Sequence, residues 1–346
     1  MEFVTLGRSD LKVSRLCLGS MGWGSRNSQG EGHAQIDRSL DAGINFIDTA
    51  EMYPTYPVKK ETVGDTETII GNWFAASARR KDVILATKVS GPNGGFKRGG
   101  KGYDSGNIGQ AVDESLKRLQ TDVIDLYQLH WPDRGSYHMR AHWTYAPKPK
   151  RAETEAHFLD VLQAMQSQID AGKIRHFGLS NETTWGTALW IRLAEQHGLP
   201  RPVTIQNEYS LTCRMADTDL AELCVNEDVD LLPFSPLAMG LLSGKYAPDV
   251  TPKNTRRAAE ATLNNRITPK IWPAIDAYRA IADAHGMDVN AMALAWTLTR
   301  PFVASSIFGA STMAQLEVAL SAADLRLPKD VLDAITAAHK AHPLPY

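Results

Sequence analysis

Short apolar runs alternate with longer segments in which apolar residues recur every three or four positions. The runs lack a strict alternation of apolar and polar residues, which is typical of strands buried on both faces of a parallel sheet. The longer segments have the period of amphipathic helices. This pattern predicts eight strands, most of them followed by a helix, near residues 16, 45, 83, 125, 175, 203, 230 and 303.

The arrangement of these elements favours a (β/α)8 barrel of the TIM type over a doubly wound sheet, because strand–helix units repeat eight times. Residues 3–6 and 11–14 flank a polar turn and predict an N-terminal β-hairpin. No linker or change of composition divides the chain, so we expect one domain over 1–346. Helices are predicted over 33–42, 65–80, 107–119, 153–171, 184–197, 216–227, 271–285, 288–299, 312–322 and 328–341.

Composition and charge narrow the class of protein. The net charge of −2 and the pI near 6.6 give no electrostatic reason to expect nucleic acid or an anionic membrane as a partner. Cys17, Cys213 and Cys224 show neither a disulfide framework nor zinc spacing, which fits a reducing compartment. No signal peptide and no apolar run of membrane-spanning length is visible, so a cytoplasmic location is expected.

Polar residues stand where the predicted strands end. In barrels of this type the active site lies at the carboxyl ends of the strands, so these side chains should meet there. The set comprises Ser20, Asp48, Lys88, His130, Ser180, Asn181, Gln206, Ser235 and Ser311.

Four residues of this region could form an acid–base unit. The phenol of Tyr53, five residues after Asp48, has an ordinary pKa of about 10, which is high for an acid at neutral pH. A nearby Lys88 ammonium should lower that pKa, and Asp48 can hold Lys88 in place. His130 can donate a hydrogen bond to a substrate oxygen. We therefore expect these four residues to be catalytic.

Three other features of the sequence would indicate phosphate binding, metal binding or Schiff-base chemistry, and the first two lack a residue that their motif requires. Residues 95–102 resemble a phosphate-binding loop, but Gly102 stands where Ser or Thr is needed. His138 and His142 are four apart, but the Glu of a metalloprotease motif is absent, and no metal site is predicted. A Schiff-base lysine at Lys88 remains an alternative, since a strand-end lysine also serves lyases.

Several motifs along the chain together match the signature blocks of one family. The first is GINFIDTAEMY over residues 43–53, and DLYQLHWP follows over 125–132. Thr87-Lys88, GLSN at 178–181, QNEYS at 206–210 and the run FSPLAMGLLSGKY at 234–246 continue the match in order. Taken together, these motifs resemble the aldo-keto reductase family, most closely its bacterial Tas-like branch, and the resemblance covers nearly the whole chain.

The resemblance implies a barrel closed at its base by the N-terminal hairpin, with C-terminal helices. It also implies NADPH-dependent reduction of an aldehyde or ketone to an alcohol. Tyr53 would be the general acid, Lys88 and Asp48 would tune it, and His130 would orient the carbonyl. Hydride would pass from nicotinamide C4 to the carbonyl carbon.

The resemblance also assigns cofactor and substrate positions residue by residue. Trp23, His130 and Trp131 would border the substrate, with the loops 91–107, 131–152 and 246–268. Val318 and Ala319 replace two polar residues common in relatives, which leaves NADH possible, and the arginine for the adenosine phosphate is open among Arg256, Arg257 and Arg266. The cofactor-binding set is Gly19, Ser20, Met21, Asp48, Ser180, Asn181, Gln206, Phe234, Ser235, Pro236, Leu237, Gly240, Lys245, Gly309, Ser311 and Gln315.

Two functions other than carbonyl reduction stay open. A cofactor-sensing regulatory subunit, as in potassium-channel β subunits, would share the barrel. A lyase acting through Lys88 is the third hypothesis. The sequence names neither the carbonyl substrate nor the oligomeric state.

Overall fold

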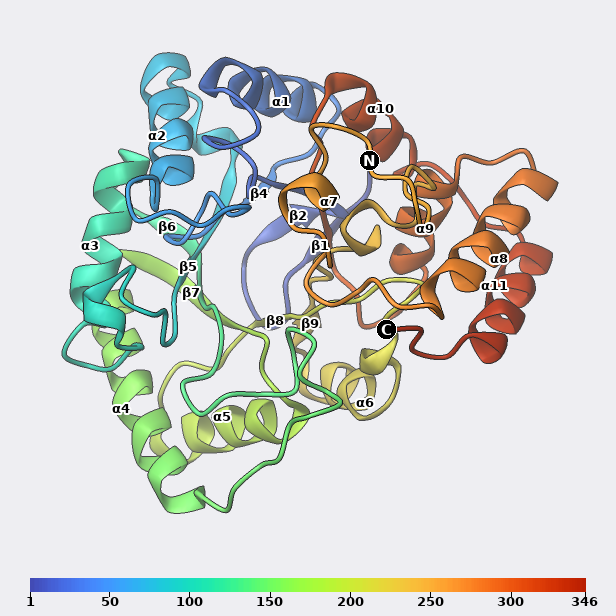
Figure 1. Cartoon of the computed structure of the whole chain (residues 1–346). Helices are drawn as coiled ribbons and strands as arrows, with labels where there is room; N and C mark the ends of the chain where they lie inside the picture. Colours follow the sequence, from blue (N-terminus) through green and yellow to red (C-terminus); the bar gives the residue numbers. More distant parts are fainter.

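The computed structural model describes all residues, 1–346. Its centre is a sheet of eight parallel strands in the order β10-β3-β4-β5-β6-β7-β8-β9, which confirms the predicted barrel (Figure 1). The strands are β3 (Leu16–Gly19), β4 (Phe46–Asp48), β5 (Ile84–Val89), β6 (Ile124–Leu129), β7 (Ile174–Ser180), β8 (Thr204–Gln206), β9 (Asp230–Leu231) and β10 (Ser306–Phe308).

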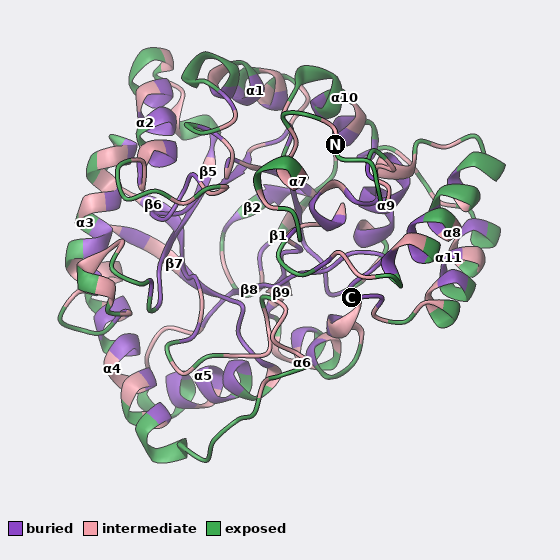
Figure 2. Cartoon of the chain, in the orientation of Figure 1, coloured by how far each residue is buried: buried purple, intermediate pink, exposed green.

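Helices surround the strands in Figure 1. They are α1 (Gln29–Asp41), α2 (Asp65–Ser77), α3 (Ile108–Leu119), α4 (Arg151–Asp170), α5 (Thr184–His197), α6 (Asp219–Glu227), α7 (Arg256–Ala259), α8 (Ile271–Ala284), α9 (Val289–Leu298), α10 (Met313–Ser321) and α11 (Lys329–Ala341). Most of them have a buried inner face and an exposed outer face (Figure 2), which is the reason for the helical period in the sequence. No helix has the length and apolar character needed to cross a bilayer.

The barrel closes between β9 and the segment that leads into β10. Leu231 pairs with Val303 in a single bridge, and the backbone of Ala304 donates to Leu231 at 3.2 Å. The strand predicted to start at residue 303 therefore begins only at Ser306. The prediction was wrong by three residues because the apolar run 302–304 serves closure and packing, and regular pairing with β3 follows it.

The N-terminal hairpin, β1 (Phe3–Thr5) and β2 (Lys12–Ser14), covers the base of the barrel. Leu6, Leu11 and Val13 are fully buried and join a small apolar cluster with inward residues of the barrel strands. Gly7 donates its amide to Asp230 at 2.6 Å, which ties the turn to β9. The predicted hairpin and its role at the base are thus both present.

Helix α1 begins four residues earlier than the predicted start at 33. Ser28 accepts from the amide of Glu31 at 3.3 Å, and the Glu31 carboxylate accepts from the amide of Ser28 at 2.7 Å. This reciprocal capping box satisfies two amides at the helix start. The Ser-x-x-Glu spacing is visible in the sequence and was the signal that the periodicity argument missed.

Candidate active site

The carboxyl ends of the strands surround one large cavity of about 1140 Å³. With the exception of Lys88, every residue that the sequence named for catalysis, cofactor or substrate lies on its wall. The loop 91–107, which was expected to border the substrate, contributes no residue to the wall, so that part of the prediction was wrong. Lys88 is fully buried behind the wall. The strand-end rule therefore brought together side chains that are up to 295 positions apart, from Ser20 to Gln315.

Asp48 is the centre of a buried hydrogen-bond network. Lys88 Nζ donates to Asp48 Oδ2 at 2.5 Å and to the Thr49 carbonyl at 2.7 Å. Asp48 Oδ1 accepts from Gln206 Nε2 at 2.9 Å and Gln128 Nε2 at 3.1 Å. The carboxylate thus uses both oxygens to hold the lysine and two amides, which fixes the direction of the ammonium.

Gln128 was not among the predicted site residues. It lies on β6, two residues before His130, and bonds to both Asp48 and Gln206. Since alternate residues of a strand share a face, the spacing from His130 was an available signal. Gln206, which the resemblance assigns to the cofactor carboxamide, also gives its Nε2 hydrogens to this network.

Tyr53 lies beside Lys88 and His130. The Lys88 ammonium is 5.0 Å from the centre of the phenol ring, and the His130 ring meets it edge-on with centroids 5.8 Å apart. Burial raises the pKa of the Tyr53 phenol, and the Lys88 charge lowers it by a smaller amount. The predicted net lowering of the Tyr53 pKa was therefore wrong. Lys88 lowers this pKa as predicted, but burial of the phenol raises it by more.

His130 is a neutral imidazole in this environment. Burial first, and then the positive charge of Lys88, hold its pKa well below the usual value. Its Nδ1 is buried and has no hydrogen-bond partner in the chain. A neutral ring with a free nitrogen can exchange a hydrogen bond with a substrate oxygen without adding charge.

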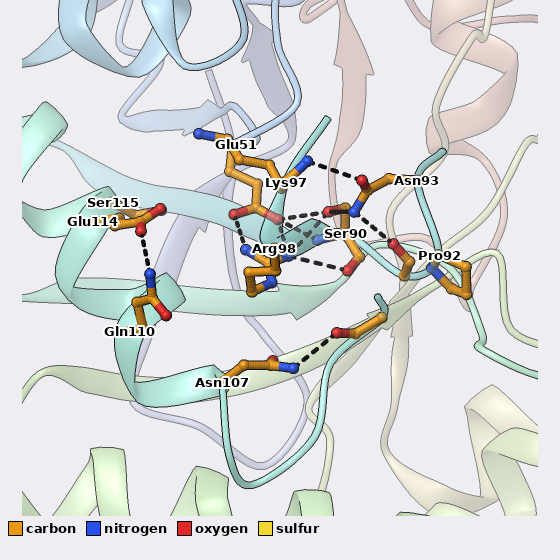
Figure 3. A network of polar contacts seen from close by, with 12 residues as sticks. Glu51, Ser90, Pro92, Asn93, Lys97, Arg98, Asn107, Gln110, Glu114 and Ser115 are labelled. Carbon is orange, nitrogen blue, oxygen red and sulfur yellow. Dashed lines mark hydrogen bonds and ion pairs between the residues drawn. The ribbon is translucent and has the colours of Figure 1, made fainter. Parts of the chain in front are cut away.

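Glu51, two residues before Tyr53, contacts Ser90 and Arg98 (Figure 3), and Ser90 follows Lys88 by two residues. Its carboxylate accepts from the amide and hydroxyl of Ser90, each at 2.7 Å. Arg98 adds a two-pronged ion pair at 2.8 and 2.5 Å. Arg98 comes from the glycine-rich loop that resembled a phosphate-binding motif, so its charge is used inside the protein.

The end of β7 offers polar groups to a ligand. Asn181 has a left-handed backbone with φ 54°, and its Nδ2 donates to the His130 carbonyl at 2.9 Å. This bond directs the side chain so that its Oδ1 is buried without a partner on the cavity wall. Ser180 donates its hydroxyl to the Gln206 carbonyl at 2.8 Å, which holds β7 and β8 together.

Another part of the cavity wall is positively charged. Lys245 and Arg256 line it without any ion pair, and Arg26 lines it with its Nη1 buried and unpartnered. Burial lowers the pKa of Lys245, and the charges of Arg256 and Arg26 lower it further. Three cations that lack carboxylate partners are suited to an anion with several charges, such as the phosphates of a dinucleotide.

The three candidate arginines of the long loop differ in their surroundings. Arg257 is outside the cavity and donates to the carbonyls of Ala247, Val250 and Pro248. Arg266 lines the cavity but is paired with Glu208. Arg256 alone of the three lines it with no ion pair.

Trp23 and Trp131 both border the cavity, and Trp131 lies beside His130. Trp23 is buried and donates to Gln35 at 3.2 Å. Trp131 packs against His130 with ring centroids 4.6 Å apart and donates to the Pro92 carbonyl at 3.0 Å. The loop 131–152 adds Met139 and Arg140, which the sequence argument missed, whereas Trp143 is exposed and Tyr145 is outside the wall.

The histidine pair and the cysteines show no metal chemistry. His138 contacts the Glu182 carbonyl at 3.0 Å, and His142 contacts the Tyr346 carbonyl at 3.1 Å. The three cysteines are buried and free. No group of three or more His, Cys, Asp or Glu residues is arranged to hold a metal ion.

Comparison with known proteins identifies the family to which the chain belongs. The sequence profile described as "Aldo/keto reductase family" matches residues 15–340. Protein tas of Escherichia coli (strain K12) is 42% identical over 100% of this chain and 99% of its own length. The uncharacterized oxidoreductase YrpG of Bacillus subtilis (strain 168) is 33% identical over 96% and 94%. A probable voltage-gated potassium channel subunit beta of Arabidopsis thaliana is 29% identical over 94% and 92%. The chain is an oxidoreductase that belongs to the aldo/keto reductase family.

Proposed function

We propose that the protein reduces an aldehyde or ketone to an alcohol with NADPH, and that Tyr53 donates the proton. The observation that carries this proposal is the meeting of Tyr53, Lys88, Asp48 and His130 in one buried cluster beside the cavity. When bound, NADPH would supply a hydride ion to the carbonyl carbon. The protein then has to orient the carbonyl and deliver a proton to its oxygen.

Tyr53 is suited to hold that proton until it is needed. Its raised pKa keeps the phenol protonated at neutral pH. As the proton leaves, negative charge develops on the phenol oxygen, and the Lys88 ammonium stabilises it. Asp48 keeps the ammonium charged and directed toward the phenol. In the reverse reaction, a Tyr53 phenolate would accept the proton of an alcohol.

His130 is suited to orient the carbonyl. Its neutral ring can donate one N–H to the carbonyl oxygen, beside the Tyr53 phenol. An imidazolium would compete with Tyr53 for the proton-donor role, and the lowered pKa avoids this near neutral pH. The two rings together define a position for one substrate oxygen.

The chain's remaining cavity residues fit a nicotinamide dinucleotide phosphate. Asn181 offers an unpartnered amide oxygen, with Ser180 and Gln206 beside it, for a carboxamide. Phe234 offers an aromatic face, and the turn 235–240 borders the cavity. Lys245 and Arg256 supply uncompensated positive charge for phosphates, which supports NADPH over NADH.

Catalysis is tested by following NADPH oxidation with a panel of aldehydes and ketones. Turnover that the Tyr53→Phe variant lacks would support the proposal. Full activity in that variant would exclude the acid role. Borohydride trapping of a substrate on Lys88 would instead indicate a lyase, which the burial of Lys88 and its bonds to Asp48 and Thr49 disfavour.

A regulatory subunit is the second candidate function. It is favoured by the similarity to proteins named as probable potassium channel β subunits from Arabidopsis thaliana and rice. Such a subunit would bind NADPH tightly and reduce no carbonyl in the panel. The complete acid–base cluster supports catalysis as the first candidate.

A further inference from the structure

A charge cluster on the cavity wall takes no part in the acid–base unit or in the proposed cofactor contacts. Glu208, two residues after Gln206, is buried between the guanidinium groups of Arg140 and Arg266. Arg266 donates Nε to Oε1 at 3.1 Å and Nη2 to Oε2 at 2.8 Å. Arg140 contacts the same carboxylate through Nη2. All three residues line the cavity.

The two arginines differ in how many of their guanidinium nitrogens have a hydrogen-bond acceptor. Arg266 uses Nε and Nη2 for its bidentate pair with Glu208 and donates Nη1 to the Leu263 carbonyl at 2.8 Å. Each of its three nitrogens therefore has an acceptor. Arg140 has its Nε buried with no acceptor in the chain. Since one carboxylate faces two guanidinium groups, the cluster carries one excess positive charge, and Arg140 holds the unused donor. A buried charged donor without an acceptor is unfavourable until a ligand supplies one.

The surrounding contacts hold Arg140 in place. Its φ of 71° and the φ of 57° at Met139 put both residues in the left-handed region, which non-glycine residues seldom occupy. Two side chains that follow Ala141, those of His142 and Trp143, fix the loop to the Tyr346 carbonyl at 3.1 and 3.0 Å. The Arg140 guanidinium lies over the Tyr346 ring, 4.6 Å from its centre, and its side chain is 5% exposed.

We propose that Arg140 binds a monoanionic group of the substrate, so that the preferred substrate is an aldehyde or ketone that carries a carboxylate. This inference rests on the proposed reduction. One excess positive charge matches one carboxylate, and guanidinium groups bind carboxylates through charge-assisted N–H bonds. Glu208 does not repel this group strongly, because Arg266 already neutralises it. Lys245 and Arg256, which are suited to phosphates, lie near Gly240 and Gly309 and have no ion pair with Glu208, although the charge of Arg266 reaches Arg256.

The test compares 4-carboxybenzaldehyde with its methyl ester, which has the same aldehyde and ring but no charge. Four proteins are assayed: the natural chain, Arg140→Gln, Arg140→Lys and Lys148→Gln. Lys148 is an exposed residue of the same loop outside the cavity, so its change is a matched control for loss of one charge. NADPH affinity is measured for each by fluorescence titration. Calorimetry measures binding of the product, 4-carboxybenzyl alcohol, to the complex with NADP+.

For the natural chain and Lys148→Gln, kcat/KM for 4-carboxybenzaldehyde should exceed kcat/KM for the methyl ester by about tenfold or more. One charged hydrogen bond provides enough binding free energy for such a ratio. Arg140→Gln should lose this preference through a higher KM, and Arg140→Lys should retain part of it. NADPH affinity should stay the same in all four.

Three results would overturn or separate the proposals. Equal preference in the natural chain and Arg140→Gln would overturn the subsite. Weaker NADPH binding by Arg140→Gln would overturn it by assigning the residue to the cofactor. Failure of the natural chain to reduce either aldehyde would count against the proposed function. The subsite would then stand only if calorimetry still showed tighter product binding to the natural chain than to Arg140→Gln.

Discussion

The Lys88 ammonium lies 5.0 Å from the centre of the Tyr53 ring, and the chain encloses both side chains almost completely. Two opposing effects meet in this pair. Loss of water raises the phenol pKa, and the neighbouring positive charge lowers it. Burial is the larger effect, so the phenol is a protonated donor that becomes acidic only as negative charge develops beside Lys88.

The first prediction concerns pH. The raised Tyr53 pKa lies above 10, so the phenol stays protonated below that pH, and the carbonyl reduction rate should be flat from pH 6.5 to 9. Alcohol oxidation needs the phenolate and should therefore rise about tenfold per pH unit over the same range. Initial rates in both directions, measured with saturating cofactor, test this. A fall in reduction between pH 7 and 9 would contradict it.

The second prediction concerns the phenol itself. Tyr53→Phe keeps the ring against Lys88 and His130 but removes the donor, so kcat for reduction should fall by about 10² to 10⁴. NADPH affinity should be unchanged. Tyr56→Phe is the matched control, because Tyr56 also lines the cavity and its hydroxyl contacts Asn264, far along the chain. It should keep kcat within a few-fold. A comparable loss in both variants would argue against a specific proton donor.

Much of the site could be predicted because its residues follow strands in a simple order. Asp48, Lys88 and His130 come at the ends of consecutive strands, and parallel strands in a barrel end on one face. The relation of Tyr53 to this group followed from its short distance along the chain. Its pKa direction did not, because the degree of enclosure depends on residues from every side of the cavity.

Contacts between distant loops could not be predicted for a related reason. Arg98 pairs with Glu51 across a glycine-rich loop, and Arg140 meets Glu208 from another strand's loop. The period of apolar residues does not specify how such loops fold, because loop backbones form irregular turns and side-chain contacts in place of the regular hydrogen bonds of helices and strands. The start of β10 was predicted too early, because the apolar residues 302–304 pack in the core and close the barrel against β9 before the regular strand begins.

The third prediction concerns the ion pair between Glu51 and Arg98. Glu51 is fully buried, so Arg98→Met would leave its carboxylate with Ser90 alone. Breaking a buried pair of this kind should lower the free energy of unfolding by about 3 kcal/mol. Denaturant unfolding measures this. The control is Lys101→Met, an exposed cation of the same loop, which should change stability by less than about 0.5 kcal/mol.

The same variant should slow catalysis as well. Glu51 connects the Tyr53 turn to Ser90, two residues after Lys88, and its amide donates to the Lys88 carbonyl at 3.2 Å. Loosening this connection should lower kcat more than it raises KM. Glu51→Gln, which keeps the shape but loses the charge, should show the same order of effects. An unchanged kcat in a destabilised Arg98→Met protein would limit the pair to a structural role.

The fourth prediction concerns the cofactor phosphates. Arg256 lies on the cavity wall without an ion pair, so Arg256→Met removes charge and leaves no buried carboxylate behind. The Kd for NADPH should rise about tenfold, equivalent to ~1.4 kcal/mol. Lys253→Met, an exposed cation of the same loop, is the control and should leave Kd unchanged. If Arg256 meets the adenosine phosphate, the Kd for NADH should change less than twofold, by about 0.4 kcal/mol or less. An equal rise for both cofactors would place Arg256 at the shared pyrophosphate, and NADPH preference would then depend on Lys245 or Arg26.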